Sequence, residues 1–126
     1  MAMRWLATAK PKEIWEEPIV GPIGDIEAAH RIRDICRAAA SIAGKAGGGR
    51  GSRPDHDARR YERASRAAME TALKISDDLL RDSAVRQIID LCFKADDLKM
   101  ARVLFRAIQA VSIREEVMRD HPQLGP

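Results

Sequence analysis

The chain has 126 residues, of which 45% are hydrophobic and 33% charged, and its formal net charge is +3. This length fits one domain, and the balance of apolar and charged residues is typical of a globular chain and excludes a disordered one. No window approaches the roughly 20 apolar residues of a membrane span, and the start lacks the apolar stretch of a secretory signal. Cys36 and Cys92 lie within helical apolar patterns. Buried thiols in a reducing compartment are therefore expected, and we predict a cytoplasmic protein.

Residues 1–24 are predicted to form an irregular N-terminal tail, because prolines and glycines interrupt any regular element. The tail nevertheless carries large apolar side chains, including Trp5, Trp15 and Ile19. Such groups either fold back onto the rest of the chain, which we favour, or contact another molecule.

Residues 25–121 are predicted to form a single helical domain, because no segment shows the alternation of a β-strand. Asp25 is a good N-cap for the first helix, and Pro54 suits the first turn of the second. Short connections favour antiparallel neighbours, so we expect an all-α, up-and-down bundle of four to five helices. The expected helices are 25–43, 54–80, 83–95, one that Asp96 or Asp97 caps, and a short one from Ile113, with a Gly-rich loop at 44–54 and a C-terminal tail at 122–126.

The second of these helices has the longest amphipathic pattern in the chain, with a kink allowed near residues 76–78. Its apolar positions alternate at spacings of three and four residues, as in the seam between packed helices. Alanine dominates this seam, so the core that it builds is thin and self-association would supplement it. The seam residues are Ala58, Tyr61, Ser65, Ala68, Ala72, Ile75 and Leu79.

A basic segment covers residues 45–66, where seven Lys and Arg residues face three acids and give a net charge of +4. A cationic surface of this kind could follow a phosphate backbone. Glu62 and Arg66 stand four residues apart, however, so such pairs could equally neutralise one another on a solvated helix face. The candidate nucleic-acid contacts are Arg50, Arg53, Arg59, Arg60, Arg63 and Arg66.

A second basic stripe, Lys99, Arg102 and Arg106, is expected on the helix after Asp97. Alone it is an ordinary solvated face; if both stripes lay in one plane of the fold, they would favour nucleic-acid binding. The Gly-rich run at 47–52 lacks the Gly-Lys-Ser/Thr ending of a nucleotide-binding loop, and no strand precedes it.

The sequence shows no complete constellation for catalysis, metal binding or cofactor binding. His30, His56 and His121 are widely separated, and no Cys-x-x-Cys pair occurs. Asp90 and Cys92 are close in the sequence, but no histidine lies nearby to act as the base that a cysteine nucleophile needs. We therefore expect no enzyme activity, cofactor, metal or small-molecule substrate, although residues distant in the sequence could still assemble a site.

Residues 88–105 resemble one helix–turn–helix unit of the pentatricopeptide and tetratricopeptide repeat classes. The similar features are the small residue Ala101, the Leu104-Phe105 pair and a short acidic turn. The resemblance covers under a fifth of the chain, and the chain holds no second copy. It implies an αα-hairpin here and assigns no binding residue.

These patterns favour a non-enzymatic protein-interaction module, which in its simplest form is a homodimer joined through the Ala-rich seam. The alternative is a nucleic-acid-binding regulatory protein that uses the basic segment. The candidate partner contacts are Trp5, Trp15, Ile19, Tyr61, Ala68 and Ala72.

Overall fold

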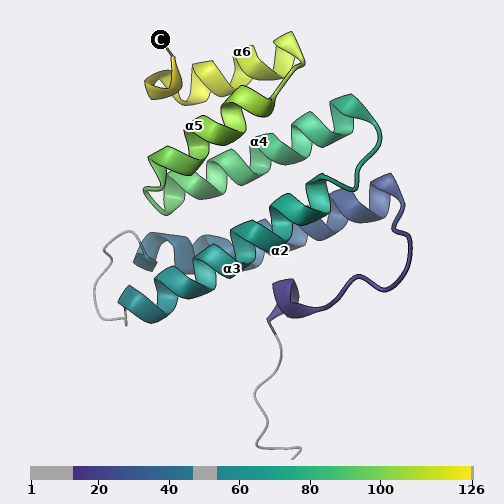
Figure 1. Ribbon diagram of the computed structural model, residues 1–126. Coiled ribbons are helices and arrows are strands. Elements are labelled where there is room, and N and C mark those ends of the chain that lie inside the picture. The colour runs from purple at the N-terminus through teal and green to yellow at the C-terminus, as the bar shows by residue number, and fades with distance from the viewer. Residues whose placement is uncertain (1–12, 47–53, 126) are drawn as a thin grey trace, which may run out of the picture.

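A computed structural model describes residues 13–46 and 54–125, which are helical throughout apart from short connections (Figure 1). The predicted all-α class is confirmed, since the described part holds five α-helices, two short 3₁₀ helices and no strand. The elements are η1 (Ile14–Glu16), α2 (Asp25–Ala46), α3 (Pro54–Ala72), α4 (Asp78–Lys94), α5 (Leu98–Ala107), α6 (Val111–Asp120) and η2 (Pro122–Leu124).

The helices stack in chain order, with α2 and α3 at one end of the molecule and α6 at the other (Figure 1). The most extensive contact joins α2 to α3, and α4 is the hub, since it touches α2, α3, α5 and α6. One cluster of buried apolar side chains runs through the described residues, and isoleucines such as Ile32, Ile35 and Ile88 supply much of its volume. Alanines on α2 and α3 allow these two helices to lie close together.

The first long helix differs from its prediction at both ends. It continues through Gly44 to Ala46, three residues beyond the expected end. Asp25 lies in its first turn, but its carboxylate accepts hydrogen bonds from Ser76 and Asp77, in the connection between α3 and α4. Ile26, in the first turn of α2, is 69% exposed.

The helix predicted over 54–80 is two helices, which corrects the sequence interpretation. Pro54 does begin α3, as predicted, but α3 ends at Ala72 and α4 starts at Asp78. The Asp77 side chain caps α4 by accepting a hydrogen bond from the Leu80 amide at 2.8 Å. Because the helical phase restarts there, Leu79 leaves the predicted seam and is exposed. The third predicted helix, 83–95, is the later part of α4.

The αα-hairpin expected around residues 88–105 is present as α4, a short turn and α5. Asp97 caps α5, as predicted, by accepting a hydrogen bond from the Met100 amide at 3.2 Å. Ser112 and Glu115 have the spacing of a capping box in the sequence, but Ser112 does not cap the last helix, because α6 begins at Val111 and Ser112 lies inside it. Val111, the first residue of α6, is exposed.

Both ends of the described chain pack on the helices. Trp15, in η1, is buried in the core, as the fold-back interpretation predicts. At the other end the expected C-terminal tail forms η2, whose Leu124 is also buried. His121 fixes this end, since its ring stacks on Phe93 and its Nε2 lies 2.8 Å from Oδ1 of Asp90.

Candidate docking groove between α3, α4 and α5

An apolar groove of about 200 Å³ lies between α3 and α5, with α4 beneath it. Each of the three helices contributes apolar side chains to the groove, because its apolar face is wider than the area that a single neighbouring helix covers. The α3 wall is made by Met69, Ala72 and Leu73, the floor by Arg81, Asp82, Val85 and Ile88 of α4, and the α5 wall by Val103, Leu104 and Ala107.

The two walls end in large apolar side chains that face solvent. Leu73 at the end of α3 is 80% exposed, and Val103 on α5 is 50% exposed. Single exposed apolar residues are common on protein surfaces, but these two border one apolar hollow. An apolar hollow with exposed apolar rims is the kind of surface that binds another apolar group.

The two polar residues of the floor are already satisfied within the chain. The Arg81 guanidinium lies 2.6 Å from Asp78 Oδ1 and donates to the Ile75 carbonyl at 3.3 Å. The buried Asp82 carboxylate accepts from the backbone amides of Gln109 and Ala110, at 3.1 and 2.8 Å. Asp82 therefore supports the start of α6, and the floor offers a ligand mainly apolar contact.

The basic residues predicted as nucleic-acid contacts separate into three groups. Arg59, Arg63 and Arg66 are exposed on α3 and form no ion pair within the described residues. Arg60 is a structural residue, because its guanidinium lies 2.6 Å from Glu13 and 3.5 Å from Asp57 and ties η1 to α3. Arg50 and Arg53 lie outside the described residues.

The second stripe, Lys99, Arg102 and Arg106, is exposed on α5. The helices that carry the two stripes are thus the two walls of one groove. The sequence indicated both stripes, but it could not show that the two helices carrying them lie on either side of α4.

The predicted partner contacts are mostly enclosed by the chain itself. Tyr61, Ala68 and Ala72 are at most 5% exposed, because the α3 seam packs into the chain's own core. Trp15 is buried as well, which leaves only the half-buried Ile19 with partial access to solvent, and Trp5 lies outside the described residues. The expected homodimer therefore has no exposed seam on α3.

Sequence reasoning missed Leu73 and Val103, although each carries a signal. Val103 stands between cations on the polar face of α5, and Leu73 falls outside the α3 seam. A large apolar residue in a polar helix face is the pattern that could have marked the groove.

The two thiols are held in their neutral form by their surroundings. Burial raises the pKa of Cys36 to about 12, with a further contribution from Cys92, and burial raises the pKa of Cys92 to about 11. Burial also raises the pKa of Tyr61, whose hydroxyl donates to Oδ2 of Asp97 at 2.7 Å. Thiols of this kind are poor nucleophiles near neutral pH.

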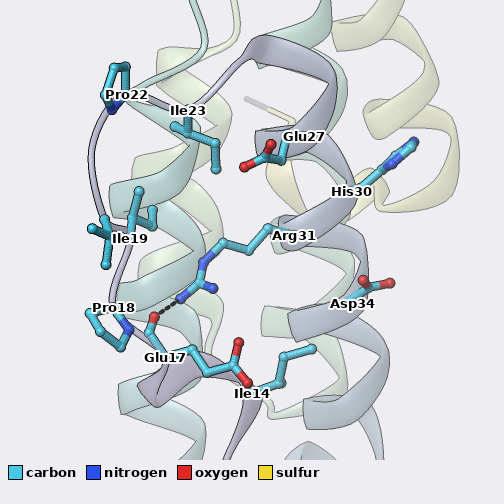
Figure 2. A pocket seen from close by; sticks show the side chains of 11 residues that line it. Ile14, Glu17, Pro18, Ile19, Pro22, Ile23, Glu27, His30, Arg31 and Asp34 are labelled. Atoms are coloured by element: carbon cyan, nitrogen blue, oxygen red, sulfur yellow. Dashed lines mark hydrogen bonds between the residues drawn. The ribbon is translucent and has the colours of Figure 1, made fainter.

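A second hollow, of about 340 Å³, lies between residues 14–23 and α2 (Figure 2). Figure 2 shows the Arg31 side chain crossing it to donate a hydrogen bond to the Glu17 carbonyl, while His30 points outward from α2. Arg31 therefore holds the N-terminal segment against the helix. The hollow carries acids on both sides, Glu17 and Glu27, and lacks the continuous apolar lining of the groove.

A third hollow, of about 400 Å³, is lined by residues of α5 and α6: Phe105, Val111, Arg114, Glu115 and Met118. Within residues 13–46 and 54–125, no group of three or more His, Cys, Asp or Glu side chains could hold a metal ion. None of the described helices is both long and apolar enough to cross a membrane. No protein-family model, curated protein or solved structure matches the chain.

Proposed function

We propose that this protein is a non-enzymatic interaction module that binds an apolar segment of a partner protein in the groove between α3, α4 and α5. The observation that carries the proposal is the pair of exposed rims, Leu73 and Val103, on either side of a hollow lined by apolar side chains. Covering a fully exposed Leu or Val side chain contributes about 1.5–3 kcal/mol, and Leu73 and Val103, at 80% and 50% exposure, each contribute a corresponding fraction of this on binding.

The shape of the groove suits a helical segment. Its walls are two helices that flank a third, and an amphipathic helix placed there would extend the same layer and present anchors every three or four residues. The groove carries no metal-ligand cluster and no activated nucleophile among its described residues, so binding is the activity that its chemistry supports.

The proposal is tested with a neutral amphipathic peptide of about 18 residues built from Leu, Ala and Gln, because shorter helices are marginal in water. Methyl NMR should show shifts on addition of the peptide at Leu73, Val85 and Val103. The double variant Leu73→Ser, Val103→Ser should lose at least about 90% of the binding, since truncating both anchors removes most of the contact. Its matched control, Val20→Ser with Val111→Ser, changes exposed residues outside the groove and should bind normally.

Shifts confined to Val111 and Met118, or binding that the groove variant leaves unchanged, would contradict this function. A second candidate, nucleic-acid binding, is favoured by the exposed basic residues on α3 and α5, the two helices that form the walls of the groove. Comparing the binding of nucleic acid with that of an acidic peptide separates these two functions.

A further inference from the structure

The α5 wall carries positive charge without any compensating acid. Lys99, Arg102 and Arg106 are its only charged residues, all are exposed, and none forms an ion pair within the described part of the chain. Arg86, by contrast, is used within the chain, since it pairs with Glu116 and Asp120. The α5 cations thus remain available to an external group.

These cations share the exposed side of α5 with the apolar rim of the groove. Lys99 lies four residues before Val103 and Arg106 lies three residues after it, spacings that place side chains on one helix face. A segment that covers Val103 therefore comes within reach of both cations. The outer edge of this wall is positive along its whole length.

The opposite wall has mixed charge. Arg66 lies three residues before Met69, but Glu62 and Glu70 stand four residues on either side of it. The two charged residues of the floor are satisfied within the chain, as described above. Charge selection by this groove must therefore come from α5.

We infer that the occupant of the groove is an acidic amphipathic helix of a partner protein. This inference rests on the proposed function. The apolar face of the partner covers Leu73 and Val103, and its carboxylates lie along Lys99 and Arg106. Nucleic acid fits less well, because bases stack on aromatic side chains and the groove lining holds none, and because phosphates gain nothing from exposed leucine and valine.

The test compares two peptides of identical length and apolar pattern. One carries Gln at every polar position and the other carries Glu at the positions that would face α5. Binding is followed by fluorescence anisotropy at about 50 and 200 mM salt, since screening acts on exposed ion pairs. The Glu peptide should bind about tenfold more tightly at the lower salt concentration, as expected for a few exposed ion pairs, and the advantage should shrink at the higher one.

Variants locate the effect. The triple change Lys99→Gln, Arg102→Gln, Arg106→Gln should abolish the preference for the Glu peptide, so that the two peptides bind with the same affinity. The matched control on α3, Arg59→Gln with Arg63→Gln, should retain the preference, because both residues lie more than one helical turn before Met69, where the groove begins on that helix. All substituted residues are exposed, so circular dichroism should show the same helical content.

The outcomes test the acidic partner and the apolar docking function separately. Equal binding of the Glu and Gln peptides would overturn the acidic partner and leave the apolar docking function standing. Failure of both peptides would overturn the docking function itself. Duplex DNA or single-stranded RNA that binds more tightly than the Glu peptide, and that loses binding in both charge variants, would replace the acidic helix with a nucleic acid.

Discussion

Asp25 connects two parts of the chain that are 51 residues apart. Its carboxylate accepts from the Ser76 amide at 2.9 Å, from the Ser76 hydroxyl at 2.8 Å and from the Asp77 amide at 2.9 Å. These three bonds, led by that from the Ser76 amide, hold the pKa of Asp25 below its ordinary value of 3.8. The charged carboxylate therefore stabilises the start of α2 against the connection before α4.

The lowered pKa predicts a pH-dependent effect of Asp25→Asn. A carboxyl whose pKa is lower in the folded state stabilises it fully above pH 3.8, and this contribution is lost as the pH falls toward the folded-state pKa. Urea unfolding should therefore show that Asp25→Asn lowers the free energy of unfolding at pH 7, with the difference from the parent narrowing below pH 4. Glu70→Gln, at an exposed residue without an ion pair in the described residues, is the control. If Asp25→Asn lowered the free energy of unfolding equally at pH 7 and pH 3, the charged carboxylate of Asp25 would not be the stabilising group.

The sequence predicts capping residues well when the cap is local and fails when the cap comes from elsewhere. Asp97 caps the helix that directly follows it, which its position predicts. Asp82 binds the amides of Gln109 and Ala110, which are 27 and 28 residues away, so its role at the start of α6 has no local signal. For the same reason the local pattern points to Ser112 as the cap, wrongly.

At the scale of elements, η1 holds the N-terminal segment against α3. Trp15 inserts into the core at 6% exposure, and the ion pair of Glu13 with Arg60 holds the same turn from outside. Burial of an indole contributes far more to stability than a partly exposed ion pair. Trp15 therefore contributes most to fixing this element, and the ion pair of Glu13 with Arg60 adds to it.

Replacing this side chain should destabilise the whole chain. Trp15→Ala should lower the free energy of unfolding by about 3–5 kcal/mol, the usual cost of a large buried aromatic, as measured by urea denaturation. Val20→Ala, in the same segment at 89% exposure, should change it by less than about 0.5 kcal/mol. If the two variants were equally stable, η1 would not be part of the cooperative core.

The break between α3 and α4 explains the largest error of the sequence interpretation. Apolar periodicity continues across residues 73–77 and therefore predicts one helix, whereas the hydrogen bonds from Ser76 and Asp77 to Asp25 stabilise a non-helical connection there. Apolar periodicity indicates which side chains of a segment are buried. It carries no information about a carboxylate elsewhere in the chain that binds the backbone of that segment. The break turns α4 back across α2 and so creates the floor of the groove.

At the scale of the molecule, the sequence predicted the class, the number of helices and both basic stripes. The groove could not be predicted, because its lining comes from three helices whose relative rotation depends on packing. For a related reason the sequence could not show where the alanine seam of α3 packs. A stripe of alanines fits another chain or the same chain equally well, and here α2 covers it.

Because the alanine seam of α3 is buried within the chain and Leu73 is exposed, substitutions at the two places should differ in their effect on stability. Ala68 is fully buried, so Ala68→Glu places an unpaired carboxylate in the core and should cost about 3–5 kcal/mol, with loss of helical signal in circular dichroism. Leu73→Glu, at 80% exposure, should leave the helical signal intact. Light scattering of both variants and the parent reports self-association at the same time.

If Ala68→Glu kept its helices and converted a dimer to a monomer, the alanine seam would be an interface between chains. If instead Leu73→Glu alone dissociated a dimer, the groove would bind a second copy, because only the groove residue changes a surface that another molecule can reach.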